Sequence, residues 1–122
     1  MTALVRHPST KPLPLSRAVQ AGGFLFLSGV LPAHPDGQPL RGTIEEETRA
    51  VLRQIDEVLT GLGARRQDVV RATIWLADLA DFAGFNAAYA EYFGDTLPAR
   101  STVQATLNRG AKVEIEVQAW RG

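Results

Sequence analysis

Apolar residues recur at three- and four-residue steps between Thr43 and Gly63, which is the spacing of one face of an α-helix. Thr43 and Glu46 match a capping box, in which a hydroxyl and a carboxylate satisfy the free N–H groups of the first turn. Gly63 follows the last apolar residue and is typical of a helix end. The pattern predicts a first helix that packs on a sheet through Ile44, Val51, Leu52, Ile55, Val58, Leu59 and Leu62.

A second helix is predicted between Asp81, as its N-cap residue, and Gly94. Its aromatic residues are spaced three or four apart, so they form a stripe along one face of the helix. We expect that stripe to belong to the core. Its members are Phe82, Phe85, Tyr89 and Phe93.

The remaining periodic segments have the alternation or the β-branched content of strands. Residues 17–21 and 24–28 are predicted to form a hairpin around Gly22-Gly23. Strands are also expected at 68–77, 101–107 and 112–120. Residues 1–14 are predicted to be an irregular arm with a short edge strand at 4–6.

This order of elements predicts an α+β fold, a mixed β-sheet with two helices packed on one face. The 122 residues suit a single domain, 1–122. Glu114 and Glu116 alternate with Val113, Ile115 and Val117, so both carboxylates lie on the face without helices. A sheet face left open in so small a protein predicts a homo-oligomer that covers it.

Composition narrows the classes of partner. Thirteen Lys and Arg balance thirteen Asp and Glu, so no net charge attracts a polyanion, and we expect no nucleic-acid partner. Hydrophobic residues make up 45% of the chain, yet no apolar run is long enough to span a bilayer, so we expect a cytoplasmic protein without a membrane partner.

Several site chemistries are excluded or unsupported. The absence of cysteine excludes disulfides, thiolate nucleophiles and Cys-ligated metals. His7 and His34 are the only histidines, and both lie in loops next to proline without the spacing of a metal site. No glycine-rich phosphate loop is present. We therefore expect neither a metal nor any other cofactor.

Three polar residues are candidates for chemistry, each with an ordinary alternative. Arg100 follows Pro98 at a loop-to-strand junction, and a rigid guanidinium suits a carboxylate ligand, although an arbitrary arginine more often pairs with a surface acid. Glu114 in a half-buried setting can position or activate a water, whereas on a solvated edge strand it is only a surface charge. Asn86 is either a polar contact or an exposed helix residue.

Several short motifs recur in a recognisable order along the chain: Ser28-Gly29, Asp78-Leu79-Ala80-Asp81-Phe82-Ala83, Asn86, Tyr89, Pro98-Ala99-Arg100-Ser101 and Val113-Glu114-Ile115-Glu116. Taken together, from about Ser16 to Trp120, they resemble the motifs of the Rid/YjgF family, the reactive-intermediate imine deaminases, in order and spacing.

The resemblance implies a chorismate-mutase-like fold and a homotrimer with sheets facing inward and a site in each inter-subunit cleft. It also implies that Arg100 binds the substrate carboxylate and that Glu114 is associated with the attacking water. Ser28 and Asn86 match two further site positions. The implied reaction is hydrolysis of a 2-imino acid or its enamine to a 2-oxo acid and ammonia, a step in metabolite damage control.

Three positions depart from the family pattern. Leu15 stands where a tyrosine is usual, Val30 where a glutamine is usual, and Thr102 where a cysteine is common. The segment between Arg100 and Glu114 is also one residue shorter. We expect a substrate-binding cleft of altered shape and polarity, in which the backbone of Thr102 still contacts the ligand.

Two other functions stay open. The departures at Leu15 and Val30 are compatible with a non-catalytic regulator that binds carboxylate metabolites through Arg100. A ribonuclease function is also attached to this family, under the label endoribonuclease L-PSP, but the charge balance and the absence of a histidine pair argue against it.

Overall fold

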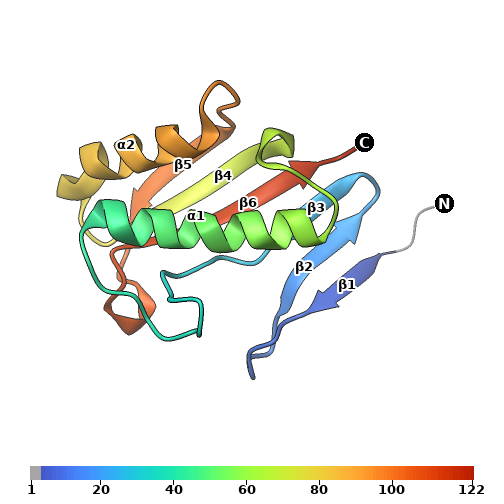
Figure 1. Ribbon diagram of the computed structural model, residues 1–122, viewed down its shortest axis with the longest axis horizontal. Helices are drawn as coiled ribbons and strands as arrows, with labels where there is room; N and C mark the ends of the chain where they lie inside the picture. Colours follow the sequence, from blue (N-terminus) through green and yellow to red (C-terminus); the bar gives the residue numbers. More distant parts are fainter. Residues whose placement is uncertain (1–3) are drawn as a thin grey trace.

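The computed structural model describes residues 4–122, which form one six-stranded sheet and two helices (Figure 1). The strand order is β1-β2-β3-β6-β4-β5. Only β4 and β5 run parallel, and every other neighbouring pair is antiparallel, so the predicted mixed sheet is confirmed. The strands are β1 (Val5–Pro8), β2 (Ser16–Ala21), β3 (Phe24–Leu27), β4 (Val69–Leu76), β5 (Ala99–Gln104) and β6 (Val113–Trp120).

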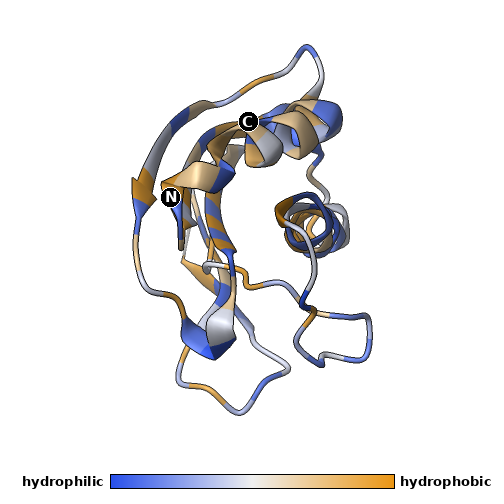
Figure 2. Cartoon of the chain, turned by 90° about the vertical axis from the view of Figure 1, so that its left-hand side faces the viewer, coloured by the Kyte–Doolittle hydropathy of each residue, from blue (hydrophilic) through white to orange (hydrophobic). Residues whose placement is uncertain are grey.

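Helices α1 (Ile44–Gly61) and α2 (Phe82–Phe93) lie on the same side of the sheet, as predicted (Figure 2). The capping box at the start of α1 is present: Glu46 N–H donates to Thr43 Oγ1 (3.1 Å) and Thr43 N–H donates to Glu46 Oε1 (2.9 Å). Gly63 follows the helix with a φ of +77°, a conformation that glycine adopts without strain. Three short 3₁₀ turns complete the chain: η1 (Arg66–Asp68), η2 (Leu79–Asp81) and η3 (Asn108–Gly110).

Asp81 occupies the N-cap position of α2, as predicted, but the capping bond expected of its side chain is absent. Asp81 is also the last residue of η2, and its backbone has left the extended conformation that a side-chain cap requires. Asp78 caps this turn instead, and its Oδ1 accepts from Ala80 N–H (2.9 Å). The chain therefore turns into α2 through η2.

The predicted aromatic stripe is correct for Phe85, Tyr89 and Phe93, which are buried, and wrong for Phe82. Phe82 is 44% exposed. It begins α2, and its ring lies 5.5 Å from the guanidinium carbon of Arg100. This ring therefore packs on a functional candidate and not in the core.

Two strands differ from their predicted bounds by more than one residue at an end, and the other four agree to within one residue. β1 covers Val5–Pro8 and pairs along β2 at the sheet edge, so the arm is more regular than expected; its residues 1–3 lie outside the described part. β5 covers Ala99–Gln104 and not 101–107, because β4, its parallel partner, ends at Leu76.

The core lies between the sheet and the helices, where α1 and α2 bury their apolar faces. The opposite face of the sheet carries Phe24, Phe26 and Trp120, which are all exposed, as well as Glu114 and Glu116. Uncovered aromatic surface of this kind supports the expectation of self-association. Among residues 4–122, no helix is long and apolar enough to cross a membrane.

Candidate functional site

Arg100 lies on β5 opposite Ala72 of β4, and both side chains point to the helix-covered face. Its Nη2 donates to Oδ1 of Asn86 on α2 at 2.6 Å. Its guanidinium carbon lies 5.3 Å from the ring centroid of Phe85 and 5.0 Å from that of Tyr89, in addition to the contact with Phe82. Three aromatic rings and one amide therefore orient this cation.

The partners of Arg100 are all neutral. Within residues 4–122, no carboxylate lies within ion-pair distance of its guanidinium. A guanidinium has five N–H donors, and the contact with Asn86 engages one side-chain acceptor. Arg100 therefore keeps both the charge and the donors that recognise a carboxylate in two parallel bonds.

A hollow of about 320 Å³ opens beside Arg100. Burial raises the pKa of its Tyr89 hydroxyl to about 12, although the nearby charge of Arg100 acts in the opposite direction. That hydroxyl is neutral near pH 7. The residues that line the hollow are Asn86, Tyr89, Ala90, Leu97, Pro98 and Arg100.

Thr102 shares the helix-covered face with Arg100, and its Oγ1 is buried without a hydrogen-bond partner in the described chain. Its backbone faces the free edge of the sheet. Leu76 lies opposite Gln104 in register, and its carbonyl accepts from Ala105 N–H (3.0 Å). Because backbone groups alternate along a strand, the N–H and C=O groups of the odd-numbered residues of β5 point to β4. The N–H and C=O groups of Thr102 thus point away from β4, where a ligand can reach them.

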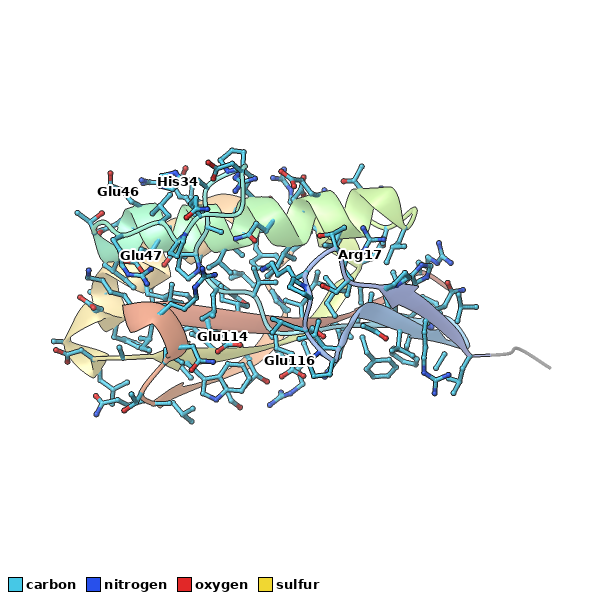
Figure 3. All side chains as sticks on the ribbon, turned by 90° about the horizontal axis from the view of Figure 1, so that it is seen from below. Arg17, His34, Glu46, Glu47, Glu114 and Glu116 are labelled. Carbon is cyan, nitrogen blue, oxygen red and sulfur yellow. The ribbon has the colours of Figure 1, made fainter. Side chains whose placement is uncertain are left out.

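Glu114 lies on β6 opposite Trp75, on the face without helices (Figure 3). Its carboxylate covers Gly29 so closely that a Cβ at that position would collide with it. Burial raises the pKa of the Glu114 carboxyl, and the neighbouring charge of Glu116 raises it further. A carboxylate with a raised pKa is a better proton acceptor than an ordinary glutamate.

The segment that contains Ser28 and Val30 lies beside Glu114. Ser28 Oγ donates to Ser16 O (2.6 Å), which joins this segment to the start of β2 next to the exposed Leu15. Val30 exchanges backbone hydrogen bonds with Ile115 (2.9 and 3.2 Å), and its side chain packs against the core. Val30 therefore offers no side-chain contact on the Glu114 face, whereas Leu15 has an exposed apolar side chain.

The structure thus forms two groups from the candidates and not one. Arg100 is hydrogen-bonded to Asn86 under α2, and Thr102 lies on the same face of β5, while Ser28 and the backbone of Val30 adjoin Glu114. The side chains of Arg100 and Glu114 point to opposite faces of the sheet. A site that uses both groups needs a second copy of the chain.

Sequence reasoning missed Glu47, whose side chain is fully buried. Its carboxylate accepts from the backbone N–H groups of Lys112 (2.9 Å) and Gly42 (3.2 Å), and Lys112 Nζ lies 3.4 Å away. It fixes the start of β6, two residues before Glu114. The signal was available, because position 47 falls on the apolar face of the predicted helix, three residues after Ile44.

Metal ligation finds no support in the described residues: no three His, Asp or Glu side chains gather where an ion would bind. The remaining chemistry consists of a free guanidinium, a carboxylate of raised pKa, and backbone groups at a strand edge. Such groups bind anions and move protons.

A family model described as Endoribonuclease L-PSP matches residues 8–121. The chain belongs to the Rid/YjgF family. It is 41% identical over 114 residues to a RutC family protein of Pyrococcus horikoshii, which covers 91% of this chain and 90% of the relative. The family predicted from the motifs is therefore confirmed.

One further relative has a named activity, and another has a solved structure. The chain is 40% identical over 111 residues to the 2-iminobutanoate/2-iminopropanoate deaminase of Mus musculus, covering 89% of this chain and 82% of that protein. A solved Rid-family structure from Yersinia pestis is 38% identical, with a TM-score of 0.89 over 98% of this chain and 100% of the other. The fold is that of the family.

Proposed function

We propose that this protein hydrolyses 2-imino acids, or the enamines in equilibrium with them, to 2-oxo acids and ammonia. The observation that carries the proposal is the guanidinium of Arg100, which is oriented by Asn86 and three aromatic rings and has no acidic partner in residues 4–122. Such a group suits the carboxylate of the substrate. The deaminase name of the mouse relative supports the same chemistry.

The proposed site lies between two copies of the chain in a homotrimer with sheets facing inward. Arg100 of one copy holds the carboxylate, and Glu114 of the neighbouring copy faces the imine carbon. The opposite orientations of these side chains in one protomer support a shared site, as does the exposed aromatic surface around Phe26.

The proposed reaction needs one base and no cofactor. Glu114 takes a proton from water as the oxygen attacks C2, and it delivers that proton to the nitrogen, which gives a tetrahedral carbinolamine. Glu114 then takes the hydroxyl proton and returns it to the nitrogen, while the C–N bond breaks and the carbonyl forms. One water is consumed, and ammonia and a 2-oxo acid leave.

The other predicted residues have positioning roles in this proposal. Asn86 aims Arg100, and the free-edge backbone of Thr102 contacts the carboxylate or the nitrogen. Ser28 holds the segment next to Glu114 through its bond to Ser16. Leu15 and Val30 contribute no polar side-chain group to this part of the site.

That last feature favours a second candidate, a regulator that binds carboxylate metabolites without turnover. Arg100 would retain its ligand, and the missing polar groups at Leu15 and Val30 would leave Glu114 without help in activating water. The two candidates share one binding site and differ in catalysis.

An imine-decay assay on four samples tests the proposal: wild type, Arg100→Ala, Glu114→Gln, and the two variants unfolded and refolded together. Each variant alone is expected to fall close to the uncatalysed rate. In the mixture, each site draws its arginine and its glutamate from different copies, so random assembly restores about a quarter of the sites.

The outcomes separate the candidates. Unchanged imine decay with wild type, alongside calorimetric binding of 2-oxobutanoate, would establish the regulator and exclude the deaminase. Full activity of Arg100→Ala would remove the proposed role of Arg100. A mixture no more active than its components would contradict a site shared between copies.

A further inference from the structure

The hollow beside Arg100 has two chemically different ends. The guanidinium of Arg100 and the amide of Asn86 are hydrogen-bonded to each other at one end. The rest of the wall consists of Ala90, Leu97, Pro98 and Tyr89, whose ring faces Arg100 and whose hydroxyl is buried without a hydrogen-bond partner in the described chain. A ligand that places a carboxylate on Arg100 therefore meets apolar surface with the remainder of its body.

We propose that this hollow is the subsite for the substrate's side chain, and that the protein prefers 2-imino acids with aliphatic side chains of several carbons over those with a methyl group. The inference rests on the proposed function. It adds a preference among substrates, which depends on the apolar surface around Leu97 and not on the reacting groups.

The volume of the hollow supports a substantial side chain. Its volume of about 320 Å³ lies at the lower end of the roughly 300–1,000 Å³ that is usual for small-molecule sites. A carboxylate and a methyl group leave most of this space to water. A branched side chain displaces that water from apolar walls, which is favourable.

Leu97 is the most exposed of the large hydrophobic residues in the described chain. Its side chain is 60% exposed, although it lines the same hollow as Arg100. Pro98 follows it and restricts the backbone between Leu97 and the strand that carries Arg100. The structure therefore places an exposed apolar residue, on a restricted backbone, next to a carboxylate-binding group. A ligand that covers Leu97 gains about fourfold in affinity for each methylene it buries.

The decisive experiment measures the binding of three stable 2-oxo acids by calorimetry, and the decay of the matching imines. Pyruvate, 2-oxobutanoate and 4-methyl-2-oxopentanoate share one carboxylate and differ in the size of the apolar side chain. We expect the last to bind about tenfold or more tightly than pyruvate, since it buries more methylene groups. The imines are generated in solution from alanine, 2-aminobutyrate and leucine by an amino-acid oxidase, with O₂ as the oxidant, and we expect kcat/KM to rise in the same order.

Two variants change the hollow in opposite ways. Leu97→Ser removes the apolar rim and is expected to abolish most of the preference for 4-methyl-2-oxopentanoate, because it weakens that ligand far more than pyruvate. Ala90→Leu fills the hollow and is expected to weaken the longest ligand about tenfold and pyruvate less. Leu4→Ser is the matched control, because Leu4 is 56% exposed and lies next to β1, at the other edge of the sheet.

Each result bears on the subsite separately from catalysis. Ordered binding without imine decay would leave the subsite standing and overturn the deaminase. Equal affinities for the three ligands in the wild type would overturn the subsite, even if all three imines decay faster. If Ala90→Leu leaves the affinity order intact, or Leu97→Ser changes the oligomeric state and not the order, the hollow holds a neighbouring copy and the inference is wrong.

Discussion

The surroundings of Arg100 and of Glu114 have opposite effects on the charge of the side chain. Arg100 is a cation surrounded by three rings and an amide, which stabilise and orient it without cancelling its charge. Glu114 is a carboxylate that lies over a glycine and next to a second glutamate, so its surroundings disfavour the charged form. One region preserves charge, and the other makes charge costly.

The difference indicates a division of labour. A group that keeps its charge binds an anion at any ordinary pH, which suits Arg100 to holding a substrate. A carboxylate whose ionised form is disfavoured takes up a proton readily, which suits Glu114 to acid–base work. The sheet separates the two groups in one chain, so a neighbouring copy must unite them if both act on one substrate.

The largest expected effect comes from Glu114→Gln, which removes the base and keeps the shape of the side chain. We expect kcat for imine hydrolysis to fall on the order of 10²- to 10⁴-fold, the contribution typical of a positioned general base. Binding of 2-oxobutanoate should change little in calorimetry. Glu57→Gln, at an exposed position on α1, is the control and should retain full activity. A loss of binding equal to the loss in kcat would move Glu114 from catalysis to recognition.

A smaller effect is expected from Arg100→Lys, which keeps the charge and removes the planar fork. Lysine cannot form two parallel bonds to a carboxylate, so we expect the Kd for 2-oxobutanoate to rise about 10- to 100-fold. Arg49→Lys, in an exposed ion pair on α1, provides the comparison. Wild-type affinity in Arg100→Lys would show that charge alone suffices and that the aromatic surroundings do not orient the ligand.

The smallest effect is a displacement of the pH profile in Glu116→Gln. In the proposed mechanism activity requires ionised Glu114, so it declines as the pH falls through the pKa of that carboxyl. Because the charge of Glu116 raises this pKa, its removal lowers the pKa and extends activity to lower pH. The acidic limb of kcat/KM against pH measures the displacement. If the acidic limb of Glu116→Gln coincides with that of the wild type, or lies at higher pH, the limb does not report the ionisation of Glu114.

Much of the fold follows from local patterns. The capping box at Thr43, the helical spacing through Leu59 and the alternation in 113–117 specify α1 and β6 because each rests on residues close together in the chain. The same alternation placed Glu114 on the face away from the helices. Family motifs added the candidate role of Arg100, which its residue type alone does not distinguish from other arginines.

Other features depend on pairings between distant segments. The last strand of the chain, β6, lies between β3 and β4, and no local pattern specifies that position. The separation of Arg100 from Glu114 follows from this order and from the register of Ala72 with Arg100. The helical spacing wrongly predicted Phe82 as a core residue, because such spacing does not show where the sheet beneath α2 ends.

The free edge of β5 has a consequence for the protein in solution. The backbone groups of Thr102 that are available to a ligand also form a template on which another extended chain can pair. An isolated protomer carries this template in the open, next to a sheet with exposed aromatic residues. Whatever occupies that edge, a ligand or a neighbouring copy, therefore also protects the protein from aggregation.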